Sequence, residues 1–459
     1  MTQQAKIDLT EGSITGHVLR MLAPFSIAIF ALISTGIVDT IYLGRLTDVN
    51  RPGLAIMALA AVGYVYPLTF MGNSANIGLG AGANSAVSRA LGQGHPEKAG
   101  RHAAASILLA LTVMSFLAVL VLTLVPFLLP LIIEREEIRV MAYDYLLISY
   151  PGLIIVSIAS MSNNVLRAHG EAILPSSIMI LSAVINIALD PFLIFGIGPF
   201  PRMEIQGAAL ATTIGHTVAA IYALYLVLFH RKAVSFVGMT WASLKRAWVI
   251  IGEVGILAAC TNIIVPVGVL GAVTILGLTL GEADVAAFTA ASRAELVSLG
   301  VLYALSACIG AITGRNGGAG KADRVRETFR VCYWICVIWG TLMAIPMVLF
   351  APQISAVFTS DPILIEKMIP YFYIVPMTIF GYGFVFVSAA GLNALGHPRF
   401  GLSYTVIRSL ILYVGFVAIG VSVAGLKGAF FGVASANLIS GIIAIIWTLK
   451  KAPMTAKQT

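Results

Sequence analysis

Long apolar runs constrain this chain more than any other feature. Only 10% of its 459 residues are charged and 59% are hydrophobic, whereas soluble domains carry about 25% charged residues. A bilayer accommodates runs of about 20 apolar residues as helices, because a helix satisfies its own backbone hydrogen bonds. Twelve such runs lie near residues 17–44, 54–82, 102–132, 138–168, 174–198, 205–229, 247–280, 283–313, 328–358, 362–394, 401–424 and 428–449. The sequence therefore predicts an all-α polytopic membrane protein with twelve transmembrane helices.

The formal charge of +8 is distributed as a topology signal. The basic residues lie in the short gaps between apolar runs, so the sequence does not favour a surface that binds nucleic acid. Nineteen Lys and Arg residues fall on the side of the termini and seven on the other side. Because positive residues are retained in the cytoplasm, we expect both termini to be cytoplasmic. The expected location is the plasma (inner) membrane of a prokaryote.

The sequence repeats itself at a shift of about 226 residues. The segment Arg89–Gly94 aligns with Arg315–Gly320, and Leu166–Gly170 aligns with Leu392–Gly396. Six spans in each half give both halves the same topology, so we expect two six-helix bundles related by a pseudo-twofold axis along the membrane normal. The predicted division is an N-terminal lobe at 1–229 that holds the cation site, a cytoplasmic linker at 230–247 and a C-terminal lobe at 248–459.

Two carboxylates lie at matching depth in the first half. Asp39 lies far along the first span and Asp190 far along the fifth, and at 1.5 Å per residue both reach roughly 24–30 Å from the cytoplasmic face. Asn186 lies one turn before Asp190, and Thr212 lies early in the sixth span. Carboxylate, amide and hydroxyl oxygens suit a hard cation such as Na⁺, or a coupled proton trap. The alternative is that each acid is a helix-end residue at the outer interface.

Other residues of these spans suggest movement or internal polarity. Pro24 interrupts the first span and Gly36 lies one turn before Asp39, so this helix is predicted to bend there, although many membrane prolines are inert. In the eighth span Arg293 and Glu295 point to different faces, and Arg408 is a candidate partner for Glu295. These residues form either a structural polar network or a coupling element.

Several other functions are disfavoured by the sequence. Arg315–Ala322 lacks the first glycine and the Ser/Thr of a phosphate loop, so transport should be driven by an ion gradient and not by ATP. Cys332 and Cys336 share a helix face without a His or carboxylate beside them, and we expect small buried side chains there. We predict no enzyme activity, no cofactor besides the coupling ion (H⁺ or Na⁺), and no metal beyond Na⁺ at Asp39, Asn186, Asp190 and Thr212.

Several segments follow one another in a familiar order: Val38-Asp39-Thr40 with Gly44, Leu166 to Gly170, Asn186 to Pro191, Gly207 to Thr212, and Ser292-Arg293-Ala294-Glu295. In this order, with a six-plus-six repeat, they resemble the multidrug and toxic compound extrusion (MATE) family over nearly the whole chain. The resemblance implies two lobes around a central cavity that rock between inward- and outward-facing states. It also implies export of amphipathic, often cationic compounds in exchange for protons or sodium ions. In the DinF-like branch, which Asn262 at the place of a second-lobe acid favours, Asp39, Asn186, Asp190 and Thr212 would form the first-lobe cation site and Pro24 the bend.

The leading hypothesis is thus a secondary multidrug antiporter that works by alternating access. We expect it to be a monomer whose partners are small amphipathic substrates and membrane lipid, with no nucleic acid. One alternative is a flippase for a lipid-linked precursor on a related fold, which needs a strongly basic cavity; intramembrane cations are few here. Another is an intramembrane aspartyl protease. Such an enzyme needs the sequence Gly-x-Gly-Asp, whereas the residues that end at Asp190 read Ala-Leu-Asp.

Overall fold

The computed structural model describes residues 8–48, 54–359, 361–450 and 454–455. Helices account for nearly all of these residues, and no strand occurs among them. Four basic residues that the orientation prediction counts, Lys6, Arg51, Lys451 and Lys457, lie outside the described ranges.

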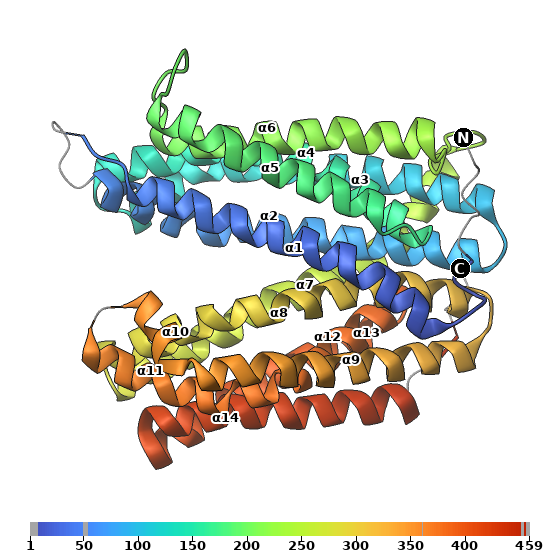
Figure 1. The fold of residues 1–459 in the computed structure, drawn as a ribbon. Helices are drawn as coiled ribbons and strands as arrows, with labels where there is room; N and C mark the ends of the chain where they lie inside the picture. The colour runs from blue at the N-terminus through green and yellow to red at the C-terminus, as the bar shows by residue number, and fades with distance from the viewer. Residues whose placement is uncertain (1–7, 49–53, 360, 451–453, 456–459) are drawn as a thin grey trace. The chain divides into compact units, whose positions relative to one another are not determined.

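The helices follow one another with short connections, so the apolar runs become long rods (Figure 1). Their bounds, in chain order, are α1 (Ile14–Gly44), α2 (Leu54–Gly92), α3 (Pro96–Ile132), α4 (Glu136–Ala168), α5 (Ile173–Phe195), α6 (Glu204–Tyr225), the π-helix η1 (Leu226–His230), α7 (Trp241–Thr279), α8 (Glu282–Gly318), α9 (Ala322–Leu349), α10 (Ala351–Phe358), α11 (Pro362–Ile374), the 3₁₀-helix η2 (Pro376–Thr378), α12 (Ile379–Ala394), α13 (Pro398–Val406), the π-helix η3 (Ile407–Tyr413) and α14 (Val414–Lys450).

The last rod is two spans joined by a sharp turn. The run from Pro398 to Lys450 is one of eleven stretches in the described residues that are long and apolar enough to cross a membrane. Its backbone leaves the helical region at Ala424 and Gly425, where Gly425 has φ +57°, a conformation that glycine adopts readily. The two arms then lie side by side, since a Cβ atom on Gly428 would meet the carbonyl oxygen of Gly420. Counting both arms confirms the predicted twelve spans.

Some helix boundaries differ from the predicted ones. The helices α2 and α8 run on to Gly92 and Gly318, past the apolar stretch that a bilayer requires, because polar residues continue a helix in water as well. The predicted span 328–358 breaks at Phe350, after which the short helix α10 begins at Ala351 with Pro352 in its first turn. The predicted span 362–394 is interrupted by the 3₁₀-helix at Pro376.

The contacts divide the chain into two compact units. We call residues 27–87 and 95–255 the N-unit, and residues 1–26, 88–94 and 256–459 the C-unit. The helix α1 therefore passes from the C-unit to the N-unit after Ser26, and α7 passes back after Gly255. The lobe boundaries at residues 229 and 248 stay a prediction.

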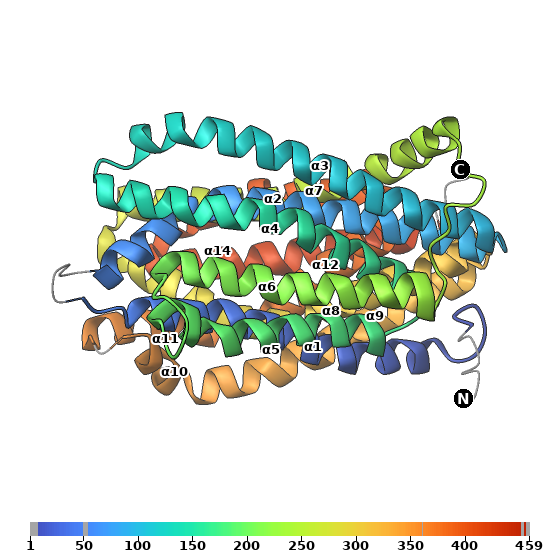
Figure 2. The same cartoon turned by 90° about the horizontal axis from the view of Figure 1, so that it is seen from above.

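In the N-unit, α6 packs against both α4 and α5, and α4 packs against α3. Figure 2 shows these green and teal helices lying along one another. The buried Tyr150 of α4 donates a hydrogen bond to the Leu68 carbonyl of α2 (2.8 Å). Gly82 allows α2 to approach α7 closely, because a Cβ atom there would meet the carbonyl oxygen of Ile251. The small residues that the sequence places inside this span thus permit helix packing, as expected for membrane bundles.

In the C-unit, α12 packs against α8, α9 and α14. Gly381 of α12 lies against α14, where a Cβ atom would meet the Asn437 carbonyl oxygen. Buried hydroxyls of Tyr333 and Ser388 share a hydrogen bond of 2.7 Å between α9 and α12.

Repeat-related residues meet in the C-unit, where the end of α2 crosses the end of α8. A Cβ atom on Gly92 would meet the carbonyl oxygen of Arg315, and one on Gly318 would meet that of Arg89. The shift of 226 relates Gly92 to Gly318 and Arg89 to Arg315, so it exchanges the two contacts and the crossing is reciprocal. A reciprocal contact of this kind is what a twofold axis produces, in agreement with the predicted symmetry.

Candidate cation site

The helices α1 and α5 place their acids at the same height in the N-unit. Asp39 lies five residues before Gly44, the last residue of α1, and Asp190 lies five residues before Phe195, the last residue of α5. At 1.5 Å per residue, both are about 7.5 Å inside the end of their helix. Both helices continue past the acids. The structure thus places each acid more than one turn inside its helix, deeper than the helix-end alternative requires.

Asn186 links the predicted residues into one cluster. Its Nδ2 atom donates to Thr212 Oγ1 of α6 at 3.0 Å and lies 3.5 Å from Asp190 Oδ1 on its own helix. The carboxyl of Asp39 lies within interaction distance of both Asp190 and Asn186. Asp190 is fully buried and Asn186 nearly so. All four predicted residues therefore lie together, on three helices.

Three oxygen atoms of this cluster are buried and accept no hydrogen bond from the described residues: Asp39 Oδ1, Asn186 Oδ1 and Asp190 Oδ2. Buried acceptors are nearly always satisfied, because an unmet acceptor costs about 1–3 kcal/mol. A proton shared between the carboxyls, or a cation ligated by these oxygens, satisfies them. The donor set contains only oxygens, which fits Na⁺ or H⁺ and disfavours soft metals.

The structure adds Tyr145 of α4 to the cluster. This half-buried tyrosine lies close enough to Asp39 and Asp190 for the charges of both to act on its hydroxyl. Its position follows from the packing of α4 against α6, and no spacing rule relates it to residues 39 or 190. The sequence contains no signal that would have identified it.

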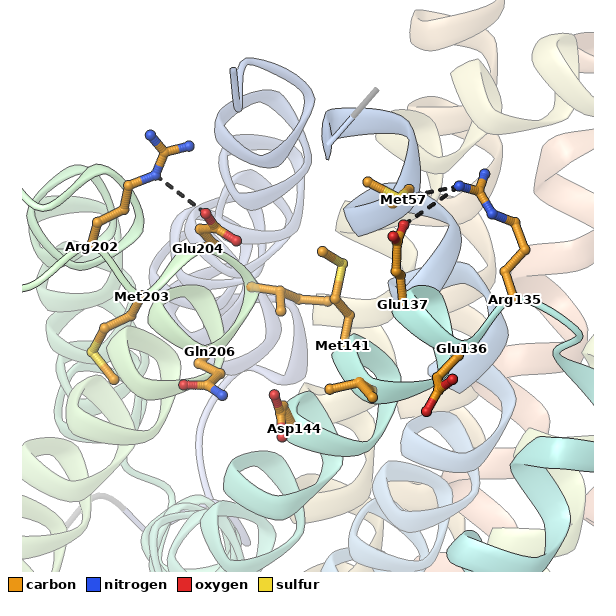
Figure 3. Close-up of a pocket in the computed structure, with 12 residues that line it drawn as sticks. Met57, Arg135, Glu136, Glu137, Met141, Asp144, Arg202, Met203, Glu204 and Gln206 are labelled. Carbon is orange, nitrogen blue, oxygen red and sulfur yellow. Dashed lines mark hydrogen bonds and ion pairs between the residues drawn. The ribbon is translucent and has the colours of Figure 1, made fainter. Parts of the chain in front are cut away.

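A pocket of about 840 Å³ opens at the end of the N-unit where α1 and α5 end and α2, α4 and α6 begin. Figure 3 shows its labelled carboxylates, Glu136, Glu137, Asp144 and Glu204, together with two arginines. The arginines form ion pairs within the pocket, Arg135 with Glu137 at 3.5 Å and Arg202 with Glu204 at 3.4 Å. Four carboxylates against two guanidinium groups leave this mouth negative, which attracts cations.

The predicted bend residues lie on α1, which is continuous through Pro24. A Cβ atom on Gly36 would meet nothing within 4 Å, so this glycine is not required for close packing. The structure therefore shows an unbroken helix with open space one turn before Asp39.

The C-unit holds a second polar network around Glu295. The Tyr371 hydroxyl donates to its carboxylate. Arg408 lies near enough to act on that carboxylate electrostatically. The Arg408 guanidinium lies over the Tyr382 ring at 3.3 Å and donates to Asn437 Oδ1 at 2.9 Å. Arg293 is exposed. The network therefore includes Glu295 and Arg408, and the structure does not bring Arg293 into it.

Three further groups of side chains lie outside both polar clusters. His216 Nδ1 shares a hydrogen bond of 2.9 Å with Ser182 Oγ between α6 and α5, as a helix-packing histidine does. Cys332 and Cys336 are buried in α9. Asp144 lines the negative mouth and not the cluster.

Comparisons with known proteins agree with this fold. The MatE family model matches residues 24–192 and 258–419. A protein of Shewanella oneidensis named FAD transporter is 30% identical, over 92% of this chain and 92% of its own length. A probable multidrug resistance protein, NorM of Thermotoga maritima, is 26% identical, over 92% of this chain and 90% of its own. A crystal structure of the Vibrio cholerae MATE transporter VcmN in the bent form has a TM-score of 0.87 at 24% identity, covering 95% of this chain and 97% of the other.

A membrane protein with twelve helices in two repeated bundles and a buried oxygen cluster belongs to the transporters and not to the enzymes. This chain is a member of the MATE family. The predicted family is confirmed, and the matches are consistent with the DinF-like branch.

Proposed function

We propose that this protein is a cation-coupled antiporter that exports amphipathic compounds in exchange for H⁺ or Na⁺. The observation that carries the proposal is the cluster of Asp39, Asn186, Asp190 and Thr212 in the N-unit. A transporter driven by ATP would need a nucleotide site, which the sequence does not offer. A buried pair of acids provides an alternative source of coupling, because its charge must be compensated whenever it is enclosed.

The chemistry of coupling follows from the repulsion between two carboxylates. Asp39 and Asp190 cannot both stay charged in contact without a proton or cation between them. Binding of the ion therefore favours a state in which α1 and α5 lie close, and its release favours a state in which they separate or hydrate. The negative mouth formed by Glu136, Asp144 and their neighbours supplies cations to this end. Alternating access follows if the ion binds one facing state more tightly than the other.

The helix α1 is the candidate moving part. It carries Asp39, it contains Pro24, and it passes from the C-unit to the N-unit after Ser26. Proline lowers the cost of bending because one backbone hydrogen bond is already absent. A change at Asp39 would thus bend α1 near Pro24, with Gly36 giving room for the repacking.

Several parts of this proposal remain expectations from the sequence. We expect the protein to be a monomer in the inner membrane of a prokaryote, with both termini in the cytoplasm. We also expect no cofactor besides the coupling ion, and an N-terminal lobe at 1–229 that holds this ion. The small-molecule class rests on relatives whose names denote multidrug resistance.

The test is efflux of a cationic dye from proteoliposomes under imposed proton and sodium gradients. We expect Asp39→Asn to lower gradient-driven efflux by about 100-fold. With only one carboxylate left in the cluster, the repulsion that requires a bound proton or cation is absent. The matched control is Asp361→Asn, an exposed acid that caps α11 of the C-unit, outside both the cluster and the negative mouth. Asparagine caps a helix as well as aspartate does. Full efflux by Asp39→Asn would end the proposal.

A second candidate is export of flavin dinucleotide, which the 30% identical relative named FAD transporter favours. That molecule combines a planar aromatic ring with an anionic diphosphate. A direct comparison of flavin and cationic dye in the same vesicles separates the two candidates. Gradient-driven movement of the flavin alone would support the second, and movement of the dye alone the first.

A further inference from the structure

The segment before α1 is docked on the connection between α8 and α9, inside the C-unit. We call residues 8–12 the N-terminal segment and residues 315–324 the receiving loop. Asn316 Nδ2 donates to the Leu9 carbonyl at 3.0 Å, Lys321 Nζ to the Thr10 carbonyl at 3.0 Å, and Arg324 Nη1 to the Gly12 carbonyl at 3.0 Å. Three side chains of the receiving loop thus hold three backbone carbonyls of a segment that is not helical.

The receiving loop is itself organised for this contact. Arg324 Nε donates to Asn316 Oδ1 at 2.9 Å, which fixes both side chains toward the N-terminal segment. Asn316 is fully buried, and Leu9 inserts with 1% of its surface exposed. A buried apolar side chain surrounded by directed hydrogen bonds is typical of a specific docking contact.

Electrostatic attraction supports the same contact. The backbone N–H of Thr10 donates to Asp8 Oδ1 at 2.8 Å. This hydrogen bond, followed by the charges of Arg315 and Lys321, lowers the pKa of the Asp8 carboxyl below its usual value of 3.8 against an opposing effect of burial. Asp8 is therefore ionised at neutral pH and faces the cations of the receiving loop.

The docked segment lies beside two features that a transport cycle must use. The ends of α2 and α8 cross at Gly92 and Gly318, and Gly318 itself belongs to the receiving loop. The segment leads into α1, whose Ile14 and Val18 are fully buried. Further along, the same helix carries Asp39.

We propose that residues 8–12 are a releasable latch, which holds the start of α1 on the α8–α9 connection and must open in each transport cycle. The inference rests on the proposed function for the cycle itself. The bonds from Lys321 and Arg324 are exposed, so each competes with a bond to water and can be released. The buried bond from Asn316 to the Leu9 carbonyl must break with them. Because α1 is continuous, a shift of α1 at the ion cluster reaches the latch through the helix.

A reversible cross-link tests whether the latch must open. In a chain whose four native cysteines (Cys260, Cys308, Cys332, Cys336) are replaced, Thr10→Cys and Lys321→Cys are joined by a short, reducible bifunctional reagent. We expect cross-linking to lower dye efflux at least tenfold and reduction to restore it. The Thr10→Cys single variant, treated identically, is the control. Undiminished efflux by the cross-linked protein would overturn the proposal.

A second readout does not depend on transport. In the same background, Leu9→Cys places a thiol at a buried position, and its rate of reaction with a soluble maleimide is measured. The rate is compared between two added substitutions, Arg324→Gln, which removes a bond to the segment, and Arg326→Gln. The second is the control, because Arg326 pairs with the fully exposed Asp323 and not with the segment. We expect Arg324→Gln to react about tenfold faster, and equal rates would refute the latch. If reduced protein moves no substrate at all, the proposed function fails, while the labelling rates still decide whether the latch opens.

Discussion

Asn186 is the residue through which the ion cluster is assembled. Its amide touches both Thr212 and Asp190, and its carbonyl oxygen is one of the three unmet acceptors. We expect Asn186→Leu to weaken cation binding about tenfold or more, because it removes a ligand and two hydrogen bonds. Thr212→Val, which removes one hydroxyl, should weaken it less. Titration calorimetry of purified protein with Na⁺, and with acid, measures both; equal affinity in Asn186→Leu would remove this residue from the site.

Glu295 and Arg408 are opposite charges buried in the same network of the C-unit. Arg408 is 6% exposed and Glu295 9%. Removing one buried charge leaves the other uncompensated, at a cost of about 3–5 kcal/mol for a close pair and less at longer range. Glu295→Gln should therefore lower the thermal unfolding temperature in detergent, whereas Arg293→Gln, at an exposed position, should not. A smaller loss in Glu295→Gln than in Arg293→Gln would contradict the network.

The Asp8 carboxyl predicts a pH dependence of the docked N-terminal segment. Its folded-state pKa is lowered, so its stabilisation is fully present above the usual value of 3.8 and is lost as the pH falls through the lowered folded value. Hydrogen exchange at residues 8–12, corrected for the intrinsic rate, should be constant from about pH 8 to pH 5 and should rise only below about pH 4. In Asp8→Asn the rise at low pH should disappear, and a rise already at about pH 6 would point to another group.

At the residue scale, the sequence predicts which side chains lie close together only where a general rule relates residue type to position in a helix. An acid deep in an apolar run requires compensation, so Asp39 and Asp190 could be singled out, and helical spacing brought in Asn186. Tyr145 and the stacking of Arg408 on Tyr382 depend on how separate helices pack. No local pattern encodes those contacts.

At the scale of elements, close helix packing depends on glycine at particular crossings. Gly381 lies against the backbone of α14, where a Cβ atom would meet Asn437, so Gly381→Leu should separate α12 from α14 and lower stability by a few kcal/mol. Gly36 has free space, so Gly36→Ala should leave the unfolding temperature unchanged or raised, since alanine favours helix by up to about 1 kcal/mol. Thermal unfolding of both variants in detergent is the measurement. Equal unfolding temperatures would show that the α12–α14 crossing is loose.

The helix α1 is the element on which the mechanism depends. If its bend at Pro24 is part of the cycle, Pro24→Ala should lower the efflux rate several-fold while leaving cation affinity at the Asp39 cluster within a factor of about two, because the proline lies about four turns away. Efflux and calorimetry on the same preparation separate the two effects. An unchanged efflux rate would make Pro24 one of the many inert membrane prolines.

Element boundaries were predicted less well than element number. Hydropathy registers the part of a helix that crosses the bilayer, so α2 and α8 extend beyond the apolar runs as polar helix. The break at Phe350 and the 3₁₀ turn at Pro376 lie inside apolar sequence, where hydropathy carries no signal of a break.

At the scale of the whole molecule, the repeat in the sequence predicted the symmetry of the fold. The 226-residue shift converts the contact of Gly92 with Arg315 into the contact of Gly318 with Arg89, so the two contacts are equivalent. Duplication preserved the scaffold, while the acids stayed in one copy. The repeat therefore predicts the architecture. The proposed position of the ion rests on a difference between the two halves, because only the first half has acids at positions 39 and 190 or their equivalents.

Orientation in the membrane is a further whole-molecule prediction. The excess of basic residues in the termini and in the loops on their side predicts that the docked N-terminal segment faces the cytoplasm and the negative mouth faces outside. In a cysteine-free background, Glu136→Cys in cells should react with an impermeant maleimide, whereas Arg326→Cys should react only after permeabilisation. The opposite pattern would invert the topology and the direction of transport.

The central claim is that the Asp39–Asp190 cluster carries the coupling ion. The most direct measurement is cation flux into dye-loaded proteoliposomes under a proton gradient or a sodium gradient imposed separately. We predict that one of the two ions moves inward as dye moves out, and that Asp190→Asn abolishes both fluxes while Asp361→Asn, at an exposed acid outside the cluster and the mouth, retains them. Dye efflux that persists in Asp190→Asn with its ion flux intact would contradict the account.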